Sequence, residues 1–307
     1  MSNIIIGTEA IANGVVTRHE LCRHYQPIFR NVHAPRVQSL TVRDRAIGAW
    51  LYSQRVAVIS GLAAAALHGA QWIDDTVDIE LVYKCPRPPG GIIARNERIA
   101  ADEWQDLDGL PLASPARTAF DLGRYRPDYD AMARLDALMA ARPYSIEDVL
   151  VLTKRYKGAR GVARLKAVLP FVDGGAQSPR ESWWRKLVID SGFPIPQTQI
   201  PVVDEHGKHI RTVDFGWDGY QVAFEYDGGQ HQSDRKQYLL DRYAIPALRR
   251  RGWAVSVVVK EDDPIHVIEE LKAAMYARGW RGAVQIPRYA YSSRRRAEIA
   301  SRQGKCE

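Results

Sequence analysis

The chain has 307 residues, and its 43 Lys and Arg against 36 Asp and Glu give a formal net charge of +7. At roughly 100–200 residues per domain, this length predicts two or three domains. The composition, 46% hydrophobic and 26% charged, indicates folded cores rather than disorder. No apolar run reaches the roughly 20 residues that cross a bilayer, so no membrane partner is expected. Cys22, Cys85 and Cys306 form no C-x-x-C pair, which favours a cytoplasmic protein over a disulfide-rich or zinc-binding one.

The first 40 residues predict a small helical unit followed by an extended segment. Residues 8–14 fit one short helix, and Thr17 with Glu20 forms a capping-box pattern that opens a second helix reaching about Tyr25. Residues 28–37 mix apolar and basic side chains, as a β-ribbon wing does. The segment is compatible with a truncated winged helix, and equally with a helical hairpin that only packs on the next domain.

A second region, residues 41–172, predicts an α/β domain. Thr41 with Asp44 opens a helix that runs through residue 53. Ser114 caps a helix in which Arg117 and Asp121 stand four residues apart, a spacing that a structural ion pair explains as well as a binding site does. Further elements are expected at residues 56–59 and 77–83 (strands), and at residues 61–68 (a helix capped by Ser60), 130–141 and 146–156 (helices).

The glycine pair at residues 174–175 marks the main boundary, so a third domain is expected over residues 173–289. Residues 290–307 are rich in Ser and Arg and predict a basic, flexible tail. Within the third domain Ser178 and Glu181 form another capping box. Its predicted elements are helices at residues 178–191, 233–251 (kinked by Pro246) and 264–278, and strands at residues 198–203, 209–215, 221–227 and 254–259.

The predicted hairpin places three carboxylates on one face. A two-residue turn at Asp218-Gly219 places Asp214 opposite Ala223, so Asp214, Glu225 and Asp227 project from one face. Hard oxygen ligands at this spacing suit Mg²⁺ or Mn²⁺, and a bound ion would activate water for phosphodiester hydrolysis. Charged side chains in a core-like strand are costly without such a partner. Salt bridges are the alternative, and these arginines are near in sequence: Arg211, Arg235, Arg242 and residues 249–251.

The motifs of this region occur together in a known group. They resemble the nuclease-like domain related to the very-short-patch mismatch-repair endonuclease, within the PD-(D/E)XK superfamily, over residues 178–259. The matching residues are Ser178-Pro179-Arg180-Glu181-Ser182, Gln199, Thr212-Val213-Asp214-Phe215, Phe224-Glu225-Tyr226-Asp227-Gly228-Gly229-Gln230-His231, Asp241-Arg242 and Arg251-Gly252-Trp253. The upstream part resembles actinobacterial AbiEi-type (abortive-infection, type IV toxin–antitoxin) proteins through the run Ser114-Pro115-Ala116-Arg117-Thr118-Ala119-Phe120-Asp121-Leu122.

This resemblance implies a restriction-endonuclease-like mixed sheet flanked by helices, behind a winged-helix-like and AbiEi-like region, in an α/β (α+β) protein. Asp214 and Glu225 would hold Mg²⁺ or Mn²⁺. Asp227 stands where the superfamily has its lysine, and Val213 replaces the proline of the motif. The catalytic residues are expected to be Glu181, Gln199, Asp214, Glu225, Asp227 and His231. Three cations on the helix after this site are expected to bind DNA phosphates, namely Arg235, Lys236 and Arg242.

Two functions therefore follow from the sequence. The first is a Mg²⁺-dependent DNA endonuclease in phage defence or DNA repair, with His231 as general acid/base. The second is a non-enzymatic DNA-binding antitoxin of the AbiEi type that represses its own operon and uses an inactive nuclease fold. A weaker third reading is a module that restrains a cognate toxin protein.

Overall fold

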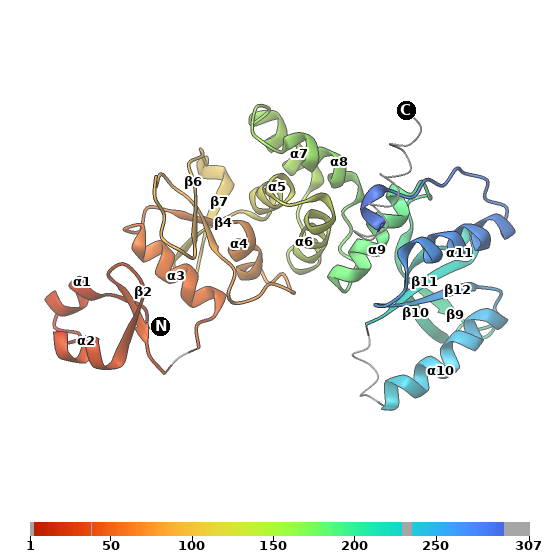
Figure 1. Ribbon diagram of the computed structural model, residues 1–307, viewed down its shortest axis with the longest axis horizontal. Helices are drawn as coiled ribbons and strands as arrows, with labels where there is room; N and C mark the ends of the chain where they lie inside the picture. Colours follow the sequence, from red (N-terminus) through yellow and green to blue (C-terminus); the bar gives the residue numbers. More distant parts are fainter. Residues whose placement is uncertain (1–2, 38, 229–234, 292–307) are drawn as a thin grey trace, which may run out of the picture. The chain divides into compact units, whose positions relative to one another are not determined.

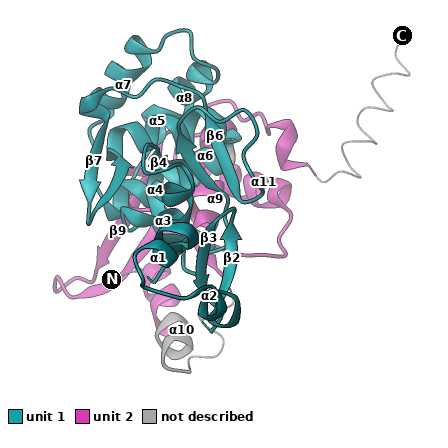
Figure 2. Cartoon of the chain, turned by 90° about the vertical axis from the view of Figure 1, so that its left-hand side faces the viewer, with its two compact units in different colours: residues 1–174 teal, residues 175–307 magenta. Residues whose placement is uncertain are grey.

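The computed structural model describes residues 3–37, 39–228 and 235–291, and Figure 1 shows its helices and strands. The chain divides into two compact units, Met1–Gly174 and Gly175–Glu307 (Figure 2). Each unit combines helices with a mixed sheet, so the protein belongs to the α+β class. Over the described residues, no helix combines the length and the apolar character that a bilayer crossing requires.

Unit 1 begins with two short helices and a three-stranded antiparallel sheet of order β1-β3-β2. The capping box is confirmed, because the Glu20 amide donates to Thr17 Oγ1 (3.2 Å) and the Thr17 amide donates to the Glu20 carboxylate (2.8 Å). The extended segment forms a hairpin, so a purely helical arrangement is excluded. The elements are β1 (Ile5–Ile6), α1 (Gly7–Ala12), α2 (Arg18–His24), β2 (Tyr25–Phe29) and β3 (Val32–Pro35).

The rest of unit 1 holds a five-stranded mixed sheet of order β6-β5-β4-β8-β7. The capping box of Thr41 and Asp44 is confirmed. Ser60 occupies the N-cap position of α4, but its side chain makes no capping hydrogen bond, so that prediction is wrong. Ser60 pairs with Glu80 within the sheet, where its side chain is buried. The strands are β4 (Val58–Ser60), β5 (Ile79–Val82), β6 (Ile92–Arg95), β7 (Trp104–Leu107) and β8 (Leu110–Ala113).

Helices make up the remainder of unit 1. They are α3 (Val42–Tyr52), α4 (Gly61–Leu67), α5 (Pro115–Tyr125), α6 (Asp128–Ala141), α7 (Ile146–Arg155) and α8 (Val162–Val168), with the short 3-10 turns η1 (Ala101–Glu103) and η2 (Leu169–Phe171). Helix α5 packs against α4, α6, α7 and α8. Its N-terminus is capped as expected, since the Arg117 amide donates to Ser114 Oγ (3.2 Å).

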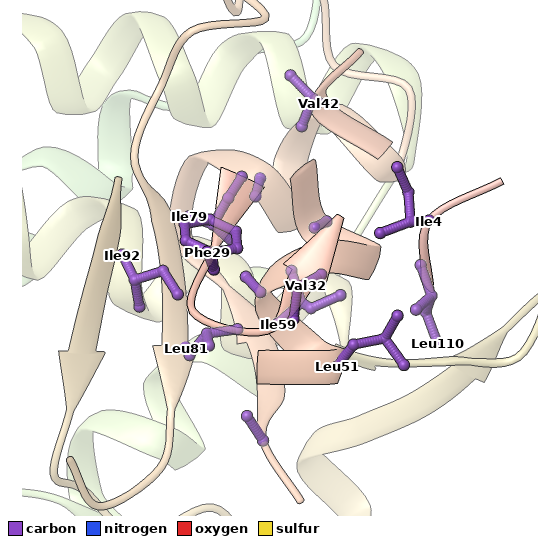
Figure 3. Packing of buried hydrophobic residues seen from close by; sticks show 14 of the residues in the cluster. Ile4, Phe29, Val32, Val42, Leu51, Ile59, Ile79, Leu81, Ile92 and Leu110 are labelled. Atoms are coloured by element: carbon purple, nitrogen blue, oxygen red, sulfur yellow. The ribbon is translucent and has the colours of Figure 1, made fainter. Parts of the chain in front are cut away.

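One apolar core joins the two sheets of unit 1. Ile4, which precedes β1, and Phe29 of β2 pack in the same cluster as Leu51 of α3 and residues of the second sheet, Ile59 and Leu81 (Figure 3). Burying side chains of this size contributes roughly 1.5–3 kcal/mol each. Removal of the first 40 residues would therefore expose part of the core of unit 1.

A buried ion network holds α5 in place. Arg117 is only 1% exposed and pairs with Asp121 (3.0 Å) and Glu103 (2.5 Å). Arg124, equally buried, pairs with Asp121 (2.8 Å) and Glu97 (2.7 Å). The spacing of Arg117 and Asp121 is thus a structural ion pair, and it belongs to a larger network than the sequence predicted.

Unit 2 contains a four-stranded sheet of order β12-β11-β10-β9, in which only the β11–β12 pair is parallel. Helices α9 and α11 share one apolar cluster with this sheet, and α10 contributes to a second cluster on the opposite face (Figure 1). The elements are α9 (Pro179–Asp190), β9 (Gln197–Val203), β10 (His209–Trp217), η3 (Asp218–Tyr220), β11 (Val222–Asp227), α10 (Arg235–Arg250), β12 (Ala254–Val259), α11 (Pro264–Ala277) and η5 (Arg288–Ala290).

The predicted two-residue turn at Asp218-Gly219 is wrong. The strands are joined by η3 and by Gln221, which adopts a left-handed conformation (φ +52°) and donates its amide to the Asp218 carbonyl (2.9 Å). Ala223 therefore lies opposite Gly216, two residues beyond the predicted partner Asp214. Because the shift is an even number of residues, it does not exchange the two faces of the hairpin.

Candidate functional site

The first candidate surface is the exposed, basic side of the first sheet and its helices. Helix α2 has no buried residue, and its Arg18 and Arg23 are exposed. Arg30 in the turn between β2 and β3 and Arg36 after β3 are exposed as well. The Arg36 guanidinium donates to the carbonyl of Cys22 (3.1 Å), which ties the hairpin to α2. Cations from both the helix and the hairpin therefore belong to one small substructure.

The acidic groups of this substructure are already engaged. Glu20 is held in the capping box of α2. Glu9 on α1 pairs with Arg55 through two contacts of 2.6 and 3.0 Å. The exposed cations of α2 and the hairpin thus have few local anionic competitors, which favours attraction of a polyanion.

The second candidate site is a cavity of about 950 Å³ in unit 2. Five of the six predicted catalytic residues line it, although they come from four different elements. They are Glu181 (α9), Gln199 (β9), Asp214 (β10), and Glu225 and Asp227 (both β11). The sixth, His231, lies outside the described residues. Arg235, Lys236 and Arg242 fall on α10, and the positions of their side chains are likewise outside the description.

Glu181 sits at the start of α9, where its carboxylate faces the cavity. Ser178 Oγ accepts from the Glu181 amide (3.1 Å), as the predicted cap requires. Glu181 Oε2 accepts from the amide of Gln177 (2.8 Å), one residue before the cap, rather than from the Ser178 amide. Only the Ser178 half of the predicted capping box is therefore present. Burial raises the pKa of Glu181 to about 7, and repulsion from Asp214 acts in the same direction. Strongly perturbed carboxylates in a cleft are typical of functional sites, although structural pairs also cause them.

Asp214 and Gln199 meet the cavity where the β9–β10 ladder is distorted. Regular pairing resumes on either side, at Val213 with Ile200 and at Phe215 with Thr198. Between them Gln199 adopts φ +50°, a left-handed conformation that costs a non-glycine residue roughly 1–2 kcal/mol. Its side-chain oxygen accepts from Gln177 Nε2 (3.1 Å). Asp214 Oδ2 accepts from the Tyr226 amide (2.7 Å), which links the two strands.

Glu225 is bound by an arginine. Arg211 Nε and Nη2 contact its two carboxylate oxygens at 2.9 and 2.7 Å. The Glu225 side chain is 5% exposed and that of Arg211 is 24% exposed. The salt-bridge alternative from the sequence is therefore confirmed at this residue.

These contacts bear on whether a divalent cation fits the cavity. The oxygen donors have the right chemistry for Mg²⁺, but both oxygens of Glu225 already bind a guanidinium. Among the side chains that the structure describes, no group of three or more His, Cys, Asp or Glu is placed to hold a metal. In this arrangement the donor set does not fit the predicted pair of metal ligands, Asp214 and Glu225.

The sequence reasoning missed several cavity residues. Lys208 and His209 come from the β9–β10 turn and the start of β10, and Tyr243 and Arg250 come from α10. Arg211 was recognised only as one of several salt-bridge partners. In the sequence Arg211 lies three residues before Asp214, on the same strand. Its partner Glu225 is on the next strand, so the local pattern did not identify the pair.

Comparison with known proteins supports one of the two resemblances. Residues 56–171 match the family described as the AbiEi antitoxin C-terminal domain. This segment covers the five-stranded sheet and helices α4 to α8, so the central part of the chain is AbiEi-like. It contains Arg117, Asp121 and the rest of the buried ion network.

The relatives that match most of the chain carry no stated activity. Two uncharacterized proteins from two strains of Mycobacterium tuberculosis are each 29% identical over 237 residues, which covers 76% of this chain and 85% of the relative. No solved structure matches the chain. The comparisons therefore support the resemblance to AbiEi antitoxins and do not test nuclease activity.

Proposed function

We propose that this protein is a DNA-binding regulator of the AbiEi antitoxin type, with operator DNA and a cognate toxin as its partners. The observation that carries the proposal is the match of residues 56–171 to the AbiEi antitoxin C-terminal domain. The exposed cations that precede this segment support it, because phosphate contacts by Lys and Arg provide most of the affinity for DNA.

The substructure before the matched segment has the parts of a truncated winged helix. Its order is β1-α1-α2-β2-β3, with the β2–β3 hairpin beside the capped helix α2. In this proposal α2 enters the major groove and presents Arg18 and Arg23. Arg30, at the tip of the hairpin, contacts the backbone. Helix α2 is suited to such a role because Arg18 and Arg23 are exposed.

The test is a mobility-shift titration with DNA from upstream of the protein's own gene. Point variants are preferable to a truncation, because residues 1–40 contribute to the core of unit 1. R18A/R23A should bind at least tenfold more weakly, since each charge-assisted hydrogen bond contributes about 1.5–3 kcal/mol. The slope of log K against log salt should fall by about 1 for each lost phosphate contact.

The matched control is K154A/K157A, which removes two exposed cations from the end of α7 and the turn after it. This variant should bind as the wild type does. Equal affinity of R18A/R23A and the wild type would refute the assignment of the interface. Absence of any specific shift with the wild type would refute the regulator.

The metal-dependent endonuclease is the second candidate. It is favoured by the gathering of Glu181, Gln199, Asp214, Glu225 and Asp227 around one cavity, and by the raised pKa of Glu181. Incubation of supercoiled plasmid and oligonucleotides with the purified protein and Mg²⁺ or Mn²⁺ tests it. Cleavage that is lost in D214A would establish the activity, and no cleavage by the wild type would eliminate it.

A further inference from the structure

We propose that Arg211 is the built-in cation of the carboxylate cavity in unit 2, and that it excludes a divalent cation from Glu225. In this proposal the cavity is neutralised by the chain itself, independently of whether unit 1 binds DNA. The role belongs to a residue that the sequence prediction did not place in the site.

The geometry of the pair carries the argument. Two guanidinium nitrogens of Arg211 face the two oxygens of Glu225 at 2.9 and 2.7 Å, which is the bidentate arrangement that matches a carboxylate best. The guanidinium keeps its charge at every accessible pH, so the pair does not dissociate by loss of the arginine proton. Burial of Glu225, which is 5% exposed, lowers the competition from water.

The position of the Arg211–Glu225 pair in the cavity affects the binding of a divalent cation. Arg211 and Glu225 both line the cavity that also holds Glu181, Asp214 and Asp227. A divalent ion bound to Glu225 would compete with the guanidinium of Arg211 for the two carboxylate oxygens. If Arg211 stayed nearby, its positive charge would repel the ion in a partly buried site where screening is weak. Occupancy of Glu225 by Arg211 therefore opposes binding of a divalent cation there.

The surrounding charges favour retention of Arg211. Asp204 also lines the cavity, but its carboxylate accepts from the amides of His206 and Lys208 (both 2.9 Å) and stabilises its own turn. Asp214 accepts from the Tyr226 amide. Glu181 accepts from the Gln177 amide. Glu181, Asp204 and Asp214 thus have backbone hydrogen bonds, whereas Glu225 accepts from the side-chain cation of Arg211.

Removal of Arg211 should therefore create affinity for a divalent cation. The experiment is a titration of the full-length protein with Mn²⁺. Binding is measured by the electron paramagnetic resonance signal of the free ion and, separately, by calorimetry. The R211Q variant should bind Mn²⁺ at least tenfold more tightly than the wild type. K208Q is the matched control, because it removes one cavity cation without releasing Glu225, and it should bind as the wild type does. The double variant R211Q/E225Q should lose the gain.

Two results would overturn the proposal. The first is saturable Mn²⁺ binding by the wild type that is abolished in E225Q, because Glu225 would then be available to metal despite Arg211. The second is a folded R211Q, checked by circular dichroism, that binds Mn²⁺ no more tightly than K208Q. If R211Q does not fold, the comparison of the wild type with E225Q still decides the question. None of these measurements uses DNA, so their outcome is separate from the test of the regulator.

Discussion

Arg117 on α5 is expected to be a major determinant of the stability of unit 1. Its side chain is 1% exposed and contacts Glu103, which is 2% exposed, and Asp121, which is 4% exposed. Arg117→Met keeps an unbranched apolar stem and removes the guanidinium with its charge. The change leaves buried carboxylates with one cation fewer, a class of perturbation that costs about 3–5 kcal/mol.

The structure indicates where in that range the cost should fall. Glu103 keeps a contact with Arg155 (2.5 Å), and Asp121 keeps one with Arg124 (2.8 Å). Neither carboxylate is therefore left without a cation, and we expect about 3 kcal/mol. For a unit of this size, such a loss lowers the Tm by roughly 6–12 °C.

Thermal unfolding followed by circular dichroism measures this effect on the full-length chain. The control is Arg155→Met, because Arg155 also contacts Glu103 but its side chain is 38% exposed. Exposed pairs contribute little, so this variant should shift the Tm far less. An Arg117→Met variant that unfolds at the wild-type temperature, or no lower than Arg155→Met, would refute the structural role of the network.

Two further predictions concern protonation and backbone conformation. Glu181 has a pKa of about 7 in the fold and about 4.5 when unfolded, so the native state binds the proton more tightly. The free energy of unfolding of unit 2 should therefore fall by up to about 3 kcal/mol as the pH rises from 4.5 through 7. Urea unfolding across this pH range should show that Glu181→Gln removes this decline in stability. The control Glu205→Gln, at an exposed turn, should leave the decline unchanged. A decline that persists in Glu181→Gln would contradict its assignment to Glu181. Gly161 and Gly109 both have φ +83°, but a Cβ on Gly161 would overlap the backbone of α5 while one on Gly109 meets open space. Gly161→Ala should therefore lower the Tm more than Gly109→Ala, and equal shifts would show that only the backbone conformation matters.

The sequence determined the features that depend on neighbours along the chain. The capping boxes at Thr17 and Thr41 were predicted correctly, because a cap is decided within four residues. The strand 254–259 was predicted with its observed bounds, since a short valine-rich run favours the extended conformation. Short strands such as β6 and β7, with only four residues each, carried too little pattern to be recognised.

Tertiary structure decided everything that depends on contacts between strands. The strands β10 and β11 are joined by η3 and Gln221 rather than by the predicted Asp218-Gly219 turn, so the hairpin register differs from the predicted one by two residues. No local pattern indicated this difference. The sequence supplied the carboxylates of the cavity and a set of candidate arginines. Only the fold selected Arg211 as the partner of Glu225, because that pair joins adjacent strands and is separated by 14 residues in the chain.

The same distinction holds for the whole protein. Composition, charge and motifs determined that the chain forms α+β units with a central AbiEi-like part and a carboxylate-bearing hairpin. For Glu225 the fold determined the partner, because it buries this carboxylate beside the guanidinium of Arg211. Burial makes an unpaired charge costly, so the neighbours in space, rather than those in sequence, determine how each charge is neutralised.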